Sequence, residues 1–142
     1  MKIILILPVL FLTLSLNAQE NPNALVNKTF IAKVGSVCEE TTDSNPCAGQ
    51  EIYLVLKFEK EEVLVSEKYI SSCGKESIII IGSYKWELLK YRKIKIETSL
   101  KEIEYIYMED LIFEFSNGQL LGKRKNGNII SEYLFESVKT NK

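Results

Sequence analysis

The cysteines are the residues of this chain best suited to do chemistry. There are three of them, Cys38, Cys47 and Cys73, and there is no histidine among the 142 residues. Cysteines can form a disulfide, and thiolates can also bind Cu(I) or Zn²⁺. Cys47 begins the sequence Cys-Ala-Gly-Gln rather than a Cys-x-x-Cys pair, and no histidine or nearby methionine completes a set of ligands. We therefore predict one disulfide, one leftover thiol, and no metal or cofactor.

The missing histidine also excludes several mechanisms. A Ser-His-Asp or Cys-His catalytic site and an imidazole proton shuttle both need that side chain. Two carboxylates can act as acid and base without it, but the glutamates are scattered and expected on outward faces. Together with the two aspartates, Asp43 and Asp110, they single out no pair. The acids at Glu39, Glu40 and Asp43 do not have the spacing of a calcium-binding loop. We predict that the chain is not an enzyme.

A set of aromatic residues forms the candidate ligand site. Aromatic side chains on one face of a sheet can line an apolar pocket, or they can simply pack as core. Arg124 is expected on the same face near a turn, where it would bind an anionic group or stack on an aromatic ring. The candidate ligand-binding residues in the interior are as follows: Tyr84, Trp86, Phe113, Phe115, Arg124 and Tyr133.

Strands must position these side chains, because apolar residues alternate with polar ones along most of the chain. Gly82, in the middle of the longest segment, indicates a bulge or bend. The segment 100–111 also fits a helix, although its Tyr-Ile-Tyr run favours a strand. The predicted strands cover the following ranges: 29–34, 51–58, 63–70, 77–88, 93–96, 103–108, 111–116 and the two segments that flank residues 126–127.

Asn-Gly pairs at 117–118 and 126–127 predict two tight hairpins, because both central positions of such a turn favour a positive φ. The first turn would place Phe115 opposite Leu120, and the second would place Leu120 opposite Tyr133. The two hairpins together predict one inward-facing layer, with the following members: Phe113, Phe115, Leu120, Ile129, Tyr133 and Phe135.

Eight to nine sequential antiparallel strands leave two exposed sheet edges unless the sheet closes. We therefore predict an all-β up-and-down meander that closes into a small lipocalin-like barrel, with a two-sheet sandwich as the alternative. A barrel of about eight strands is either filled by side chains or holds one small ligand. No linker, repeat or low-complexity tract interrupts residues 19–142, which indicates a single domain.

The meander brings the cysteines to one end of the barrel, since the first and third connections open on the same side. Cys38 and Cys47 lie in the first connection and Cys73 in the third. Residues paired across the hairpin around Lys60 have numbers that sum to about 120, so Cys47 and Cys73 should lie nearly opposite each other. We favour the disulfide Cys47–Cys73, with Cys38–Cys47 as the main alternative; Cys38–Cys73 and no bond stay open.

Residues 1–18 have the layout of a secretory signal peptide: a positive start, an apolar stretch, and Leu16 and Ala18 at the positions of an A-x-A-like cleavage site. The apolar stretch is short for a membrane span, and an uncleaved anchor is the alternative. The end of this leader resembles signal peptides of Bacteroidetes-type Gram-negative bacteria, which implies a periplasmic or secreted protein. Lys+Arg 18 against Asp+Glu 19 argues against nucleic-acid binding.

Three short motifs carry a resemblance to known proteins. They are Asn45-Pro46-Cys47-Ala48, Ser66-Glu67-Lys68-Tyr69 and Gly82-Ser83-Tyr84-Lys85-Trp86. With the strands between them they resemble the N-terminal domain of NlpE-type envelope lipoproteins, and the chain as a whole is similar to bacterial lipocalin-like and META-type small β-barrels. The resemblance implies an up-and-down barrel in the envelope. The chain lacks the lipoprotein cysteine and the Cys-x-x-Cys motif, so a copper role is not carried over.

These observations favour an exported, non-catalytic protein that binds a small or apolar ligand inside the barrel. The alternative is a protein–protein module, an enzyme inhibitor or immunity-type protein, that recognises its partner with the 39–50 end of the barrel, because loops on a rigid scaffold often carry recognition. A structural envelope protein without a ligand is a third class. We expect no membrane span after the leader is removed, and the sequence leaves the oligomeric state open.

Overall fold

The computed structural model of the chain describes residues 22–38, 48–97 and 111–138. The predicted leader, Cys47 and the predicted strand 103–108 therefore lie outside the described residues. So does the helix alternative for 100–111, except its last residue, Leu111, which begins a strand. The elements, in chain order, are η1 (Pro22–Ala24), β1 (Thr29–Cys38), β2 (Gly49–Phe58), β3 (Glu62–Ser71), β4 (Glu76–Leu88), η2 (Lys90–Arg92), β5 (Lys93–Ile96), β6 (Leu111–Ser116), β7 (Gln119–Asn126) and β8 (Ile129–Val138).

The eight strands form a closed antiparallel barrel in the order β1-β2-β3-β4-β5-β6-β7-β8, and β8 pairs with β1 to close it. The predicted all-β meander barrel is confirmed, and the two-sheet sandwich is wrong. Each strand pairs with the next strand in the sequence, and the β8–β1 pairing closes the ring. Closure therefore removes the exposed sheet edges at the middle of the molecule.

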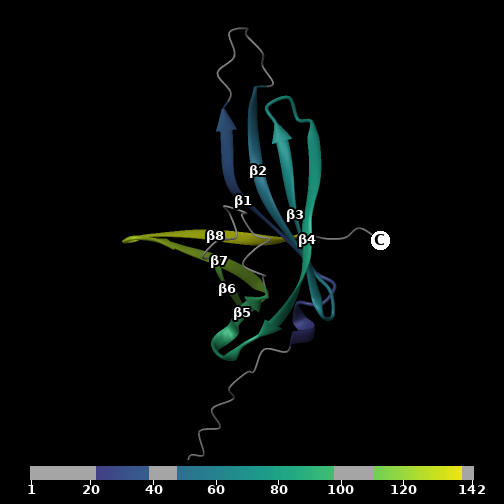
Figure 1. Cartoon of the computed structure of the whole chain (residues 1–142), viewed down its shortest axis with the longest axis vertical. Coiled ribbons are helices and arrows are strands. Elements are labelled where there is room, and N and C mark those ends of the chain that lie inside the picture. The colour runs from purple at the N-terminus through teal and green to yellow at the C-terminus, as the bar shows by residue number, and fades with distance from the viewer. Residues whose placement is uncertain (1–21, 39–47, 98–110, 139–142) are drawn as a thin grey trace, which may run out of the picture.

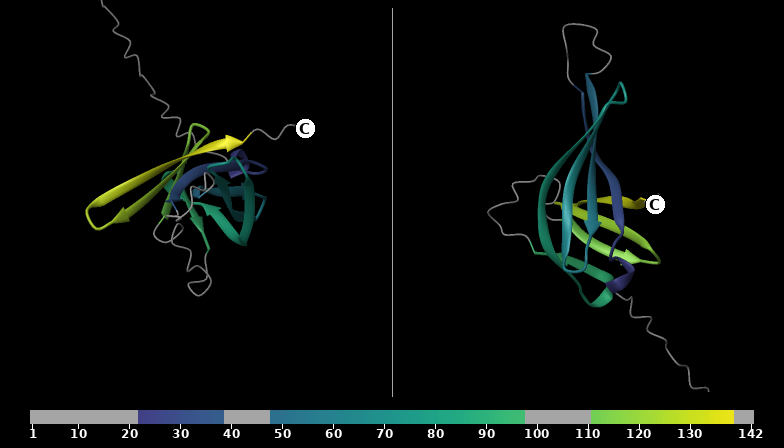
Figure 2. Two further views of the ribbon diagram at one scale, coloured as in Figure 1. Left: turned by 90° about the horizontal axis from the view of Figure 1, so that it is seen from above. Right: turned by 90° about the vertical axis from the view of Figure 1, so that its right-hand side faces the viewer.

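The barrel has two unlike halves. Strands β1 to β4 are long and run along the long axis of the molecule, whereas β7 and β8 cross that axis (Figure 1). Seen from other directions, the β7–β8 hairpin projects to one side and β1 to β4 curve upward past the closure (Figure 2). Within the described residues, β1 meets β8 only through Thr29–Ile31 and β4 meets β5 only through Trp86–Leu88. The strands therefore close the barrel at its middle and continue beyond it.

Two irregularities bend the long strands. The β1–β2 register shifts between Lys33 and Gly35, and the β3–β4 register shifts where Val65 faces Gly82 and Ser66 faces Ile80. The second shift confirms the irregularity predicted around Gly82. A Cβ at Gly82 would lie 2.7 Å from the Tyr84 hydroxyl, so the glycine leaves the space that the tyrosine ring occupies.

Apolar side chains from both halves fill the middle of the barrel. The rings of Phe30 and Phe58 meet edge to face at 5.9 Å, and Phe30 meets Phe115 at 6.2 Å. Burying one such side chain contributes about 1.5–3 kcal/mol. The fully buried side chains with the largest volumes are Phe30, Phe58, Phe115, Phe135, Leu25, Leu54, Leu56, Leu120, Val63 and Val65.

The first Asn-Gly turn forms as predicted. Asn117 and Gly118 both have positive φ values, 53° and 78°, and Phe115 faces Leu120. Positive φ at both central positions is the signature of the tight hairpin turn that Asn-Gly favours.

The second predicted register is wrong. Asn126 pairs with Ile129, so Gly127 and Asn128 are the central turn residues, and Leu120 faces Phe135 rather than Tyr133. Gly127 has a φ of 58°, which suits a turn with glycine at its first central position. The predicted pairing was off by two residues, and a shift of two keeps each side chain on its own face.

The inward layer therefore survives the corrected register, with one exception. Phe113, Phe115, Leu120 and Phe135 are buried, and Tyr133 packs against them. Ile129 is 69% exposed, which contradicts its predicted place in the layer. It lies at the tip of the β7–β8 hairpin, beyond the closure of the barrel, where its strand has no opposing core to meet.

Candidate functional site

The predicted ligand-binding aromatic residues come together in one cluster. Phe113 and Phe115 are each only 2% exposed, and the Phe113 ring packs at 5.7 Å against Phe135. Tyr84 and Tyr133 are partly buried and pack against the same core. These contacts are those of a packed interior, and the role of the cluster in ligand binding stays a prediction.

Trp86 and Arg124 occupy the margin of that cluster. The Trp86 ring lies 5.1 Å from the Phe58 ring, and its indole N–H donates a hydrogen bond to the Glu59 carbonyl at 3.0 Å. Arg124 is half-buried on β7, where it faces Leu111 on one side and Ser131 on the other. Both residues lie on the predicted face, and Trp86 is held by the turn between β2 and β3.

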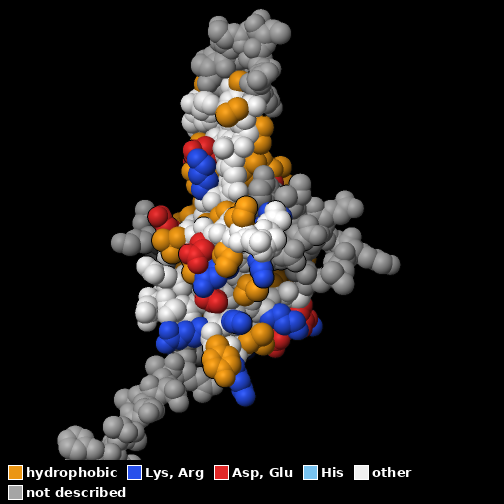
Figure 3. Space-filling model, turned by 90° about the vertical axis from the view of Figure 1, so that its left-hand side faces the viewer, with side chains coloured by type: hydrophobic (Ala, Val, Ile, Leu, Met, Phe, Trp, Pro, Cys, Tyr) orange, Lys and Arg blue, Asp and Glu red, His pale blue; other side chains and the backbone are white. Residues whose placement is uncertain are grey.

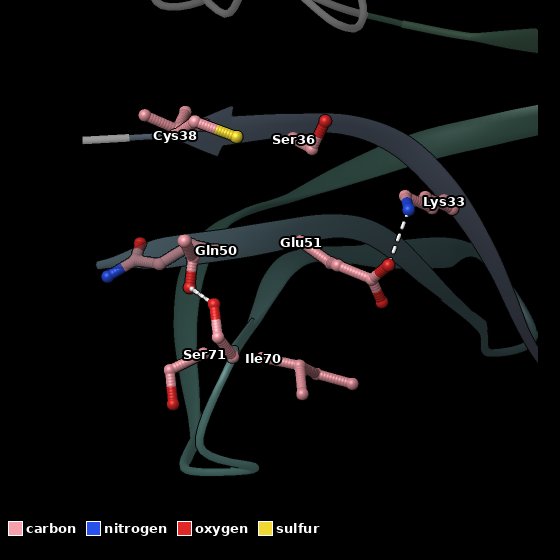
Figure 4. Close-up of a pocket in the computed structure, with 10 residues that line it drawn as sticks. Lys33, Ser36, Cys38, Gln50, Glu51, Ile70 and Ser71 are labelled. Carbon is pink, nitrogen blue, oxygen red and sulfur yellow. Dashed lines mark hydrogen bonds and ion pairs between the residues drawn. The ribbon is translucent and has the colours of Figure 1, made fainter. Parts of the chain in front are cut away.

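A groove of about 460 Å³ lies on the outer face of β1, β2 and β3 where they run past the closure (Figure 4). We call it the end groove. Its lining mixes hydroxyl, amide and charged groups with short apolar side chains. The lining residues are Lys33, Ser36, Val37, Cys38, Gly49, Gln50, Glu51, Ile70, Ser71 and Ser72. This is the end of the barrel from which the 39–47 connection departs.

An ion pair crosses the end groove between β1 and β2. Lys33 Nζ lies 2.5 Å from Glu51 Oε1, and the Tyr53 hydroxyl donates to Glu51 Oε2 at 2.7 Å (Figure 4). The Lys33 hydrogen bond, followed by that of Tyr53, lowers the pKa of Glu51, and the pKa of Lys33 and that of Tyr53 are raised by their hydrogen bonds to Glu51. Both members of the pair are therefore charged at neutral pH, and the groove presents a neutralised pair rather than a net charge.

Gly49 and Ser72, which both line the end groove, are in close contact. The Ser72 hydroxyl donates a hydrogen bond to the Gly49 carbonyl at 3.0 Å, and the Ser72 N–H donates to the same oxygen at 2.8 Å. A Cβ at Gly49 would lie 2.6 Å from that hydroxyl. A larger residue at this position would displace Ser72, so the glycine ties the β2–β3 pairing together at the end of the groove.

The cysteines of the described residues lie at this same end of the barrel. Cys38 ends β1 as a free, exposed thiol and lines the end groove, whereas Cys73 is not free. A free Cys38 is inconsistent with the alternative pairing Cys38–Cys47. Ser72, beside Cys73, is hydrogen-bonded to Gly49, two residues after Cys47 in the sequence. The favoured pairing stays a prediction, because Cys47 lies outside the described residues.

A buried acid lies on the opposite, inner face of the same strands. Glu67 is 3% exposed and pairs across the sheet with Leu54 and Ile79. Its Oε2 accepts a hydrogen bond from the Tyr69 hydroxyl, while its buried Oε1 has no hydrogen-bond partner among the described residues. Burial raises the pKa of Glu67, and the Tyr69 hydrogen bond opposes that shift.

Sequence reasoning missed Glu67 as a site, although a signal was present. Val63, Val65 and Glu67 alternate along β3, and both valines are fully buried. A charged residue in phase with buried residues is a candidate for function, because an acid on an inward face must be compensated or must serve a purpose. The predictions treated the glutamates as outward-facing as a class, which is wrong for Glu67.

Among the residues that the structure describes, no three histidine, cysteine, aspartate or glutamate side chains gather as a metal site would require. Within the same part of the chain, no helix has the length and apolar character needed to span a membrane. No family model, curated protein or solved structure matches the chain. The site must therefore be interpreted from its own geometry.

Proposed function

We propose that this chain is a non-catalytic binding protein that recognises a protein partner with the end groove. The single observation that carries the proposal is the groove itself, about 460 Å³ in volume and lined by hydroxyl and amide groups. The predicted interior residues Phe113 and Phe115, by contrast, are nearly fully buried. The neutralised Lys33–Glu51 pair favours a polar partner surface of low net charge, because a strongly charged surface would have to compete with that pair.

We further propose that the chain is exported, with residues 1–18 removed, and that Cys47 and Cys73 form a disulfide at this end. The free thiol of Cys38 and the Ser72–Gly49 hydrogen bonds beside Cys73 support the pairing. Such a bond would anchor the 39–47 connection next to the end groove, and it would suit an oxidising compartment. The closed meander is compatible with the lipocalin-like barrels that the sequence resembles.

Native mass spectrometry of the protein purified from its own medium or periplasm tests the partner proposal. We expect a stoichiometric protein complex with the wild type, and loss of that complex with Ser36→Trp, which fills the groove. Gln119→Trp is the matched control, because Gln119 is an exposed, uncharged residue at the Asn117-Gly118 turn. A complex that survives Ser36→Trp, or that is lost equally with Gln119→Trp, would contradict the proposal.

A small apolar ligand inside the barrel is the second candidate function. It is favoured because Tyr84, Trp86 and Tyr133 pack beside the core yet remain only partly buried, which is how residues at the mouth of a pocket are placed. The same mass spectra distinguish the two candidates. A small molecule retained by the wild type and lost with Trp86→Ala, without any protein partner, would support the second and contradict the first.

A further inference from the structure

The inner face of β3 carries a carboxyl group that the fold leaves incompletely satisfied. The Glu67 side chain is only 3% exposed. Its neighbours across the sheet are Leu54, which is fully buried, and Ile79, which is 56% exposed. The carboxyl group therefore lies at the upper boundary of the packed core, one step from the region where the inner face opens to solvent.

Only one polar group of the described residues serves this carboxyl. The Tyr69 hydroxyl donates to Oε2, and Oε1 has no partner. The nearest basic residue in sequence, Lys68, lies on the opposite face, where it forms an ion pair with Glu76 at 2.8 Å. Burial raises the pKa of Glu67, the Tyr69 hydrogen bond opposes that rise, and no lysine or arginine of the described residues lowers the pKa further.

Buried carboxylates in folded proteins are normally paired with a cation or fully hydrogen-bonded. A buried acid that retains one free oxygen beside an aromatic ring and an exposed isoleucine has the composition of a site for a cation with an apolar body. The ammonium group would bind Oε1, and the apolar part would lie against Ile79 and Tyr69.

We propose that Glu67 and Tyr69 bind the ammonium group of a small organic amine at the mouth of the barrel. The site is on the face opposite the end groove and does not depend on it. This proposal rests on the second candidate function, which assigns a small ligand to the inner face of the barrel. It goes further by naming the chemical class of that ligand.

Isothermal titration calorimetry with n-hexylammonium, n-hexanol and hexanoate tests the site. We expect hexylammonium to bind the wild type, hexanol to bind more weakly by about tenfold, and hexanoate not to bind, because only the ammonium pairs with the carboxylate. Glu67→Gln should weaken hexylammonium by about tenfold or more, while its affinity for hexanol stays unchanged.

Glu62→Gln is the matched control, since Glu62 is an exposed acid on the same strand whose Oε2 accepts from Ser83. It should bind hexylammonium as the wild type does. Equal affinity for hexylammonium and hexanol, no binding of hexylammonium, or equal losses in Glu67→Gln and Glu62→Gln would each overturn the amine site. A neutral small molecule that co-purifies with the wild type and with Glu67→Gln alike would support the second candidate function and still overturn this site.

Discussion

The two halves of the barrel are alike at the centre and different where their strands run past it. At the centre, Phe30 and Phe58 from the β1–β4 half meet Phe115 from the β5–β8 half. Beyond the centre, β1 to β3 carry the polar end groove, whereas the tip of the β7–β8 hairpin exposes Ile129 by 69% and Ile130 by 64%. Figure 3 views the side toward which this hairpin points, and apolar side chains lie there among charged ones.

The difference teaches that distance from the closure, rather than residue type, decides burial in this barrel. Ile94 in β5 is 5% exposed, while Ile79, which lies opposite Glu67 on the inner face of the projecting part of β4, is 56% exposed. The same side chain is core in one place and surface in the other because only the closed middle supplies an opposing layer. Recognition is therefore expected on the projecting parts, where polar and apolar groups meet solvent.

The largest expected effect comes from truncating a ring that both halves share. Phe115→Ala should lower the free energy of unfolding by about 3–5 kcal/mol, because it removes a fully buried aromatic ring and leaves a cavity. Urea unfolding at equilibrium measures the change. Ile129→Ala is the control from the hairpin tip and should change stability by no more than about 0.5 kcal/mol. Similar losses in the two variants would show that the tip is buried in solution and would break the comparison.

The disulfide proposal predicts the next largest effect. If Cys47 and Cys73 are bonded, Cys73→Ser should destabilise the protein by about 3 kcal/mol through the loop that the bond closes, whereas Cys38→Ser should leave stability nearly unchanged. Unfolding curves of both variants and mapping of unreduced peptides measure this. A free Cys47 in the peptide map would rule out the bond.

Glu67→Gln should stabilise the protein in amine-free buffer. Since the pKa of Glu67 is raised above its ordinary 4.5, the folded state binds more protons between that value and the raised one, and stability falls as the pH rises through this window. The glutamine variant escapes this loss, so at about pH 7 it should gain about 1–3 kcal/mol.

The gain from Glu67→Gln should shrink as the pH falls and vanish below the ordinary pKa, where the glutamate is protonated in both the folded and the unfolded states. Urea unfolding at several pH values measures both limits. A glutamine variant that is less stable than the wild type at neutral pH would mean that the carboxylate has a compensating partner.

The smallest effect concerns the end groove. The hydrogen bonds from Lys33 and Tyr53 lower the pKa of Glu51, so its side-chain carbon should titrate by NMR below the range of an ordinary glutamate. Tyr53→Phe removes the second donor and should move this pKa part of the way back. A Glu51 pKa in the ordinary range would show that the Lys33 and Tyr53 hydrogen bonds to Glu51 are not kept in solution. It would thereby weaken the contrast between the polar groove and the apolar hairpin tip.

Much of the fold could be predicted because its signals are local. Alternation along β2 and β3 and the Asn117-Gly118 turn depend on neighbouring residues, and all three are confirmed. The turn at Gly127 was misplaced by one residue, which shifts the strand pairing by two, because Asn126-Gly127 and Gly127-Asn128 both offer a glycine at a central position. Pairing with β7 chose between them, and that pairing is not visible in the dipeptide alone.

The sites were harder to predict. Aromatic residues on one face of a sheet indicate either a ligand pocket or a packed core. The sequence pattern is the same in both cases, so it does not distinguish them. The end groove gathers residues from three strands, and its shape depends on the β1 irregularity near Gly35 and on the contact between Gly49 and Ser72. No local pattern carries that information.

The sequence by itself determined the all-β class, the order of the strands and the face on which most side chains lie, because alternation and turn residues act over a few positions. Only the tertiary structure decided where the barrel closes, and closure is a long-range event between β1 and β8. Ile129 and Glu67 are both in phase with core residues, yet Ile129 is exposed and Glu67 is buried, because burial requires an opposing layer that a single strand does not encode.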